Sequence, residues 1–433
     1  MASSNGAMVS DMIDQPLPGF DVGERVIWEP TRAFAFERLE RFLPRAGRAY
    51  ARRRNYDLGP QDRSNVSALS PLIRYRLILE EEVLRETLRL HSLEEAEKFV
   101  QEVVWRAYFK GWLEHRPEVW ARYCANRDRW LRVLETDPTL DARFGRAVSG
   151  GTGIECLDAW AQELVETGYL HNHARMWFAS IWIFTLDLPW ELGADFFLRH
   201  LLDGDPASNT ASWRWVAGLH TPGKTYLARP DNIERFTSGR FSPGDTLAGA
   251  APALWEPALP QPLPLQLPDR LDTTGPFALL VTEEDCVPEK LDLPSTPAAV
   301  LGWRCTKARS PLPGGELARD FASGAVDDAL ARCASTFGLD PDCCMGVDAD
   351  ETIDWLRSRG LTTVVTGHVP VGPVADTLEA HAGAWDAAGI RCVAVRRRYD
   401  ELLWPHATQG FFALKRKIPD VLAALGLVSG THS

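Results

Sequence analysis

The segment LLDGDPASNTASWRW concentrates polar and aromatic side chains that can bind a ligand. It holds the carboxylates of Asp203 and Asp205, the amide of Asn209 and the indoles of Trp213 and Trp215. An ordinary helix would carry leucine and alanine at most of these positions. Three other segments of the same half of the chain have side chains of this kind.

The segment FVQEVVWRAYF, residues 99–109, places Glu102, Trp105 and Arg106 at positions i, i+3 and i+4. This spacing puts them on one face of a helix. A carboxylate, an indole and a guanidinium on one face can line a cavity for a flat, polar ligand. Taken alone, the segment is also typical of a salt-bridged helix with a half-buried tryptophan.

The segment SALSPLIRY starts at Ser67 and has a second serine at position 70. Pro71 follows, and proline is well suited to the first turn of a helix. Hydroxyls and free backbone N–H groups at a helix start can hold a phosphate. A serine that only caps the helix is the common alternative.

The segment TGYLHNHARMWF holds His171 and His173 two residues apart, so on a helix they point to different sides. A metal pair is therefore not expected, and we predict no metal site. Arg175 lies in an apolar helix and needs a carboxylate partner, which Asp203 or Asp205 can supply.

Cysteine spacing and charge limit the classes of function. The eight cysteines form no CxxC pair, which argues against zinc and iron–sulfur sites and favours reduced thiols. The net charge of −12 argues against non-specific binding of polyanions. A local cluster of arginines could still bind nucleic acid, because arginines beside aromatic residues can contact phosphates and bases. Such a cluster is equally typical of a solvent-exposed helix face. The cluster consists of Arg52, Arg53, Arg54, Arg63, Arg74 and Arg76.

The chain divides into two halves and a linker. Residues 1–27 are expected to form a flexible tail, and residues 28–246 show helical periodicity that predicts an all-α domain. Ser92 and Glu95 form a capping box at the start of one helix. Residues 247–269 are rich in Pro and Ala and read as a linker.

Residues 270–433 alternate strand and helix patterns, which predicts a Rossmann-like, doubly wound parallel α/β domain. The expected strands are PFALLVT, AAVLGW, TTVVTG and RCVAVRR. No GxGxxG motif follows a strand, so nucleotide binding there is not supported. The chain has no membrane-spanning run and no secretory signal, and we expect a cytoplasmic protein.

Taken together and in order, the segments of residues 35–240 resemble the FAD-binding domain of the DNA photolyase/cryptochrome family. SALSPLIRY resembles the family's phosphate-clasp segment, EVVWRAYF its substrate-cavity helix, and TGYLHNHARM with DGDPASNTASWRW its flavin-enclosing segment. The resemblance implies an FAD cofactor whose flavin ring is held by the segment DGDPASNTASWRW. The implied cofactor-binding residues are Tyr50, Ser67, Leu69, Ser70, Phe99, Arg106, Tyr169, Arg175, Asp203, Asp205 and Asn209.

The resemblance also implies roles in catalysis and substrate binding. Asn209 faces N5 of the flavin, and Trp190 and Trp213 match two members of an electron-transfer chain; with Glu102 these are the implied catalytic residues. The outermost tryptophan of that chain has no match, and Trp130 lies nearby but out of register. The implied pocket for a flipped-out pyrimidine dimer is Glu102, Trp105, Asn172, Met176 and Trp215.

Met176 favours repair of cyclobutane dimers over (6-4) photoproducts, because the family members that act on the latter carry a second histidine there. The resemblance thus implies a deoxyribodipyrimidine photo-lyase that acts on DNA containing pyrimidine dimers.

The sequence also departs from the family pattern. The α/β region follows the FAD domain instead of preceding it, and VPVGPVADTLEAHAGAWDAAGIRCVAVRRRYDELLWPHATQGFFALKRKIPDVL resembles the end of the family's antenna domain. Ala68 and Ala107 replace an arginine and an acidic residue. The presence of a second, antenna chromophore stays open.

Three alternatives to repair follow. One is a cryptochrome-like blue-light photoreceptor that signals through a protein partner, favoured by the acidic C-terminal half. A second is a flavoprotein whose light or redox chemistry acts on something other than DNA. The last is a tryptophan-rich helical bundle without a cofactor.

Overall fold

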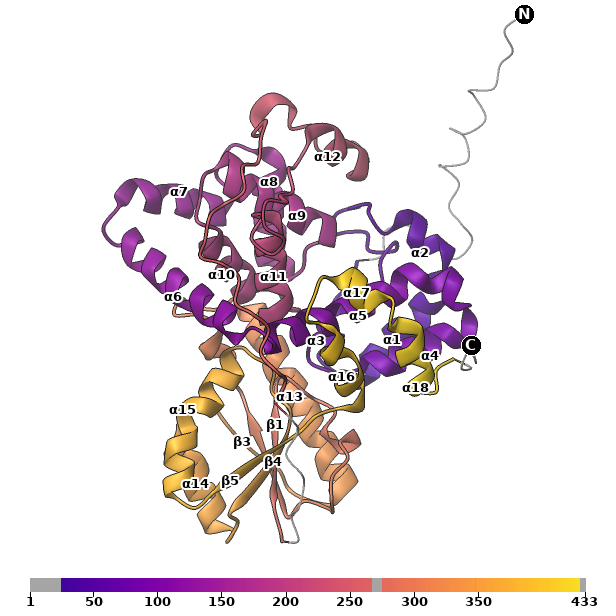
Figure 1. Cartoon of the computed structure of the whole chain (residues 1–433), viewed down its shortest axis with the longest axis vertical. Helices are drawn as coiled ribbons and strands as arrows, with labels where there is room; N and C mark the ends of the chain where they lie inside the picture. Colours follow the sequence, from indigo (N-terminus) through magenta and orange to yellow (C-terminus); the bar gives the residue numbers. More distant parts are fainter. Residues whose placement is uncertain (1–24, 267–274, 347, 429–433) are drawn as a thin grey trace, which may run out of the picture.

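The computed structural model describes residues 25–266, 275–346 and 348–428. Most of the predicted tail, residues 1–24, and the end of the predicted linker, residues 267–269, lie outside the described residues. Within residues 25–266 the regular elements are helices (Figure 1). The helices are α1 (Arg32–Phe42), α2 (Arg48–Arg53), α3 (Ser70–Arg74), α4 (Glu80–Leu90), α5 (Leu93–Glu114), α6 (Pro117–Leu134), α7 (Pro138–Ser149), α8 (Glu155–Thr167), α9 (Asn172–Ser180), α10 (Trp190–His200), α11 (Pro206–Val216) and α12 (Pro230–Phe236).

The run LIRYRLILEEEVLRETLRL folds as two helices, α3 and α4, and not as the single helix that its apolar spacing suggests. Arg76 lies between them with a left-handed φ of 53°. Its guanidinium is buried and pairs with Asp400 at 2.6 Å and with Asp285 at 3.3 Å. The partners come from the second half of the chain, so a tertiary contact breaks the helix.

The second half contains a five-stranded parallel sheet with the order β3-β2-β1-β4-β5. The four expected strands are present, and a short fifth strand, β3, was missed because it has only three residues. The elements are β1 (Ala278–Thr282), β2 (Ala299–Trp303), α13 (Glu316–Phe337), β3 (Asp342–Cys344), α14 (Ala349–Ser358), β4 (Thr363–Gly367), α15 (Pro373–Ala387), β5 (Arg391–Val395), α16 (Arg398–Leu403), α17 (Phe411–Lys415) and α18 (Ile418–Ala424).

Helices cover both faces of this sheet. Side chains alternate along a strand, and Leu279 and Val281 of β1 belong to a core that includes α13. Ala278 and Leu280 point the other way, into a core with Trp385 of α15 and residues of α14. A sheet buried on both sides explains why the strands read as nearly continuous apolar runs.

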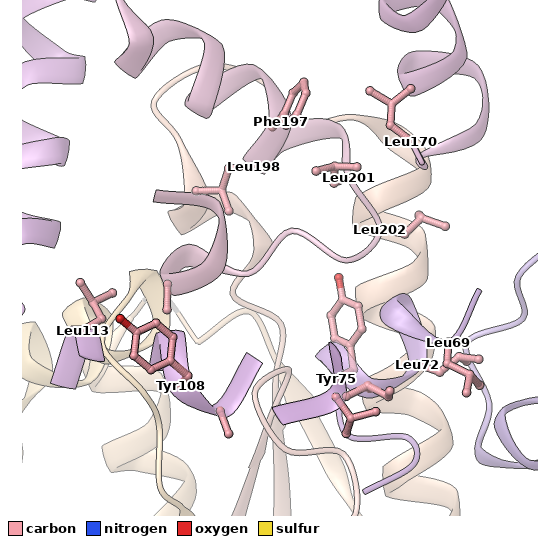
Figure 2. Packing of buried hydrophobic residues seen from close by; sticks show 14 of the residues in the cluster. Leu69, Leu72, Tyr75, Tyr108, Leu113, Leu170, Phe197, Leu198, Leu201 and Leu202 are labelled. Atoms are coloured by element: carbon pink, nitrogen blue, oxygen red, sulfur yellow. The ribbon is translucent and has the colours of Figure 1, made fainter. Parts of the chain in front are cut away.

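The end of the chain returns to the helical half. In Figure 1 the yellow helices α16, α17 and α18 lie over α5, α1 and α4 and not over the sheet. The largest apolar core is therefore shared between the two halves. Figure 2 shows part of it, with Tyr75 pointing toward the loop that carries Leu201 and Leu202.

Within the three described ranges, no helix combines the length and the apolar character needed to cross a membrane.

Candidate functional site

Helix α5 positions Glu102, Trp105 and Arg106. Its start is fixed by Ser92, whose hydroxyl accepts from the backbone N–H of Glu95 at 3.2 Å. The Glu95 carboxylate in turn accepts from the N–H of Ser92 at 3.4 Å, so the predicted capping box is present. On this continuous helix Glu102 lies one turn before Trp105 and Arg106.

Arg175 finds its carboxylate partner in Asp203. The guanidinium of Arg175, on α9, donates to Oδ2 of Asp203 at 2.9 Å, and a second N–H donates to the carbonyl of Leu170. Burial opposes the ionisation of Asp203, but the charge and hydrogen bond of Arg175 hold the pKa of that carboxyl below its usual range.

Asp205 is the N-cap of α11 and also faces α5. Its Oδ1 accepts from the N–H of Ser208 at 2.8 Å. Its Oδ2 lies 3.5 Å from Nη1 of Arg106 and 3.6 Å from Nζ of Lys110. Burial disfavours the charged form, yet Lys110, Arg106 and Arg74 together keep the pKa of Asp205 well below its usual value. Asp205 is therefore an anion held by cations.

Three buried polar atoms in this region have no hydrogen-bond partner among the described residues. They are Nη1 of Arg106, Oδ1 of Asp203 and Oδ2 of Asp205. Nη1 of Arg106 and Oδ2 of Asp205 attract each other as an ion pair at 3.5 Å, whereas Oδ1 of Asp203 has no hydrogen bond. A buried polar atom without a partner costs about 1–3 kcal/mol, so several together indicate a missing partner. A ligand with both hydrogen-bond donors and acceptors fits this set, and FAD, with its flat ring and its phosphates, is such a ligand.

The segment from Ser67 to Ser70 carries backbone strain. Ala68 has a left-handed φ of 53°, which costs a residue with a side chain about 1–2 kcal/mol. Its carbonyl accepts from the indole of Trp28 at 2.9 Å, and the carbonyl of Ser67 accepts from Arg38 at 3.0 Å. These contacts hold the strained segment in place, and strain of this kind clusters at binding sites.

The aromatic residues of the predicted cofactor set fall into two clusters. Tyr50 and Phe99 pack edge to face, with ring centroids 5.3 Å apart. Tyr169 stacks on Trp28 at 4.9 Å, and the guanidinium of Arg175 lies 5.6 Å from the Tyr169 ring. Tyr169 therefore belongs with the Arg175–Asp203 pair. Leu69 is fully buried in the core, and Ser70 offers its carbonyl to Arg106 at 3.5 Å.

Comparison with known proteins gives the family of the helical half. Residues 99–238 match the family model described as the FAD binding domain of DNA photolyase. The helical half is a photolyase-type FAD-binding domain. Its charged pair Arg175–Asp203, and Asp205 with Arg106, lie inside the matched residues.

Curated relatives carry the name deoxyribodipyrimidine photo-lyase. One from Streptomyces griseus is 33% identical over 225 residues, which is 50% of this chain and 47% of the relative. One from Synechococcus is 30% identical over 206 residues, 46% of this chain and 41% of the relative. The solved structure of a class III photolyase from Agrobacterium tumefaciens is 29% identical, with a TM-score of 0.40 over 49% of this chain and 44% of that one. The chain spans about half the length of the curated relatives it matches.

In the photolyase-type domain, Asn209 is turned toward α10. Its side-chain amide donates to the carbonyl of Ala194 at 2.8 Å, and the residue is buried. That hydrogen bond fixes the orientation of the side chain.

The residues predicted to bind a substrate contact other parts of the chain rather than one another. Glu102 pairs with Arg54. Trp105 stacks on Phe411 of α17, with centroids 3.6 Å apart and an interplanar angle of 12°. Trp215 stacks on Tyr226 at 5.5 Å. Asn172 is exposed at the start of α9, and Met176 is partly buried one turn later.

Trp213 and Trp190 are both buried against the core. A Cβ added at Gly193 of α10 would lie 2.3 Å from Cη2 of Trp213, so this glycine makes room for the indole. Gly193 is one helical turn after Trp190, so Trp213 of α11 packs against α10 one turn beyond Trp190. Trp213 also meets Trp182 edge to face at 6.2 Å.

Sequence reasoning missed three residues of this region, namely Lys110, Trp28 and Phe411. Lys110 follows Arg106 by four residues on α5, and this spacing was the signal that could have revealed it. Trp28 and Phe411 are far away in sequence, and only the fold brings them to the site.

A cavity of about 340 Å³ lies after the carboxyl end of β2, beside the end of α10. Its lining includes Arg199, Lys307, Arg309 and Arg319. In parallel sheets ligands bind at the carboxyl ends of strands. The cavity is large enough for part of a second ligand, and its identity stays open. Among the described residues, no three His, Cys, Asp or Glu side chains are grouped to hold a metal ion.

Proposed function

We propose that this chain is a light-dependent FAD flavoprotein that repairs cyclobutane pyrimidine dimers in DNA. The observation that carries the proposal is the buried cluster of Arg106, Asp203 and Asp205, whose polar atoms lack hydrogen bonds, within residues that match a photolyase-type FAD-binding domain. The photo-lyase names of the relatives support the lyase activity.

The residues that would hold FAD divide by chemistry. Arg175 and Asp203 would flank the flavin ring, Asp205 would accept a hydrogen bond from it, and Asn209 would contact its reactive part. The remaining members enclose the phosphates, ribose and adenine end: Tyr50, Ser67, Leu69, Ser70, Phe99, Arg106 and Tyr169. When bound, reduced FAD supplies an electron on absorbing blue light.

The rest of the reaction depends on the chain's own residues. Glu102 would hold the dimer by its polar edge, and Trp105 and Trp215 would stack on it. Asn172 and Met176 would complete the pocket wall. Burial of Asp203 and Asp205 would exclude water from the bound ring and keep two carboxylates beside it.

A second candidate function is a blue-light photoreceptor that signals through a protein partner. The observation in its favour is that Phe411 already covers the indole of Trp105. A lesion that stacks on that face must first displace α17, whereas a photoreceptor has no such requirement. A partner protein that recognises α17 is the corresponding expectation.

The first test measures the absorption spectrum of the purified protein and then the binding of an oligothymidylate that contains dimers. We expect a flavin spectrum, and light-dependent recovery of thymine absorbance once the flavin is reduced. Glu102→Ala and Trp105→Ala should each weaken dimer binding at least tenfold, because each removes a direct contact.

The matched control is Glu118→Ala, which removes a solvent-exposed carboxylate on the neighbouring helix α6. Phe411→Ala should strengthen dimer binding if the pocket accepts a lesion. Flavin photoreduction without repair, with dimer binding unchanged in all four variants, would overturn the repair function in favour of the photoreceptor. A colourless protein that takes up no FAD would overturn both.

A further inference from the structure

A row of buried aromatic rings continues beyond Trp190. The Trp190 ring, on α10, lies 5.7 Å from the Tyr123 ring on α6, with an interplanar angle of 35°. Tyr123 in turn lies 5.2 Å from Trp120, at 37°. All three side chains are buried. Trp213 of α11 packs on Gly193, one turn from Trp190, so it lies against α10 at the other end of this row.

The row ends at a carboxylate from the other half of the chain. The indole N–H of Trp120 donates to Oδ2 of Asp376 at 2.8 Å. Asp376 lies in the first turn of α15, so this bond crosses the boundary between the helical half and the sheet. Burial raises the pKa of the Asp376 carboxyl, which makes its anion a better proton acceptor.

The chemistry of the two ring types assigns different roles to Tyr123 and Trp120. An oxidised phenol needs a base to take its proton, and the Tyr123 hydroxyl is buried without a hydrogen-bond partner among the described residues. Oxidation at Tyr123 is therefore unfavourable, and its ring serves as a bridge. An oxidised indole that can pass its N–H proton to a carboxylate becomes a neutral radical, which is a stable end point.

We propose that Trp120 is the terminal electron donor of this aromatic row and that Asp376 takes the indole proton. The inference rests on the proposed function for its oxidant, photoexcited oxidised FAD. One electron leaves Trp120, passes by way of the Tyr123 bridge, Trp190 and Trp213, and reaches the flavin. The proton leaves the indole nitrogen of Trp120 for the Asp376 carboxylate, so charge and atoms balance.

The alternative donor on the same helix is Trp130. Its ring is partly exposed, and the guanidinium of Arg129 lies 4.9 Å from its centroid. A cation over the ring disfavours a positive charge on the indole. Trp130 is therefore the matched control for Trp120.

The test is transient absorption of the FAD-loaded full-length protein after a light pulse. Trp120→Phe should reduce the yield of the long-lived tryptophan radical at least tenfold, whereas Trp130→Phe should leave it unchanged. Asp376→Asn should keep the first electron transfer but slow the loss of the indole proton at least tenfold, so that the radical persists in its protonated form. In D2O the proton-loss step should slow in the wild type. Circular dichroism of each variant checks that the fold is kept.

Loss of the radical in Trp130→Phe with its retention in Trp120→Phe would overturn the inference. If the protein takes up no FAD, the proposed function fails, and the inference is tested separately with azide radicals as one-electron oxidants of the protein. Trp120→Phe should then remove the slowest-decaying tryptophan radical. A radical that decays as in the wild type would overturn the assignment of Trp120.

Discussion

At the scale of single residues, the loop from Asp203 to Asp205 carries carboxylates that the fold does not fully hydrogen-bond. Asp203 has one oxygen bound to Arg175 and one without a hydrogen bond. Asp205 has one oxygen hydrogen-bonded at the start of α11 and one that only ion-pairs with Arg106 and Lys110. When the protein hydrogen-bonds only one oxygen of a buried carboxylate, the other oxygen can accept a hydrogen bond from a ligand. The candidate site is therefore marked by the ion pairs together with the atoms that lack hydrogen bonds.

Glu191, in the first turn of α10 beside Trp190, gives a pH prediction at this scale. Burial raises the pKa of its carboxyl to about 7. Because the folded-state pKa lies above the unfolded value, the stability that Glu191 contributes is fully present below about pH 4.5 and is lost as the pH rises through 7. Glu191→Gln, which stays neutral, should therefore become more stable than the wild type as the pH rises, by roughly 3 kcal/mol at most.

The measurement is the free energy of unfolding of both proteins in urea at pH 5 and pH 8. Glu155→Gln is the control, since Glu155 is exposed in the first turn of α8. An equal difference between Glu191→Gln and wild type at the two pH values would contradict the prediction.

At the scale of elements, helix α10 shows how one small residue shapes the site. A Cβ at Gly193 would lie 2.3 Å from Trp213 and 2.9 Å from Trp182. Gly in a helix interior is otherwise unfavourable by about 1 kcal/mol relative to Ala. Glycine is therefore favoured at position 193 because a larger side chain would overlap the indoles of Trp213 and Trp182.

The matched pair Gly193→Ala and Gly383→Ala tests this explanation. Gly383 lies in α15 with open space around its Cα, so alanine there should stabilise the protein by about 0.5–1 kcal/mol. Alanine at Gly193 should destabilise it by about 1–2 kcal/mol, since overpacking outweighs the gain in helix propensity. Thermal unfolding shows whether each variant has a higher or lower melting temperature than the wild type. Stabilisation by Gly193→Ala would contradict the explanation, because it would mean that the indoles rearrange freely.

At the scale of the whole molecule, buried ions join the two halves. Glu284, just after β1, accepts two N–H groups of Arg74 at 2.6 and 3.0 Å, and its carboxylate lies 3.5 Å from Nζ of Lys110. Arg74 also donates to the carbonyl of Gly204, between Asp203 and Asp205. The sheet thus supports the loop from Asp203 to Asp205 through Arg74 and Lys110.

Glu284→Gln should cost about 3 kcal/mol, because it leaves Arg74 and Lys110 buried with less opposing charge. We expect wild type and variant to unfold in a single transition, with circular dichroism and tryptophan fluorescence coincident, because one core spans both halves. Asp342→Asn, which breaks an exposed pair with Arg359, should change stability by less than about 1 kcal/mol. Two separate transitions in the wild type would show that the halves fold independently.

The sequence by itself determined the local features of this protein. The capping box at Ser92, four of the strands, the helices between them and the pairing of Arg175 with an aspartate all depend on near neighbours or on regular spacing. The order of the segments with polar and aromatic residues was enough to predict the family of the helical half, which the match over residues 99–238 confirmed. Periodicity and motif spacing are properties of the chain, so they survive without a structure.

Only the tertiary structure decided which distant residues meet. Four features depend on contacts between parts of the chain that are far apart in sequence. They are the pairing of Arg175 with Asp203 and not Asp205, the helix break at Arg76, the stack of Phe411 on Trp105, and the hydrogen bond from Trp120 to Asp376. Such contacts depend on how the helices pack and on where buried charges find their partners. No local sequence pattern specifies these contacts, because the sequence around each residue is compatible with its local structure whether or not the contact forms.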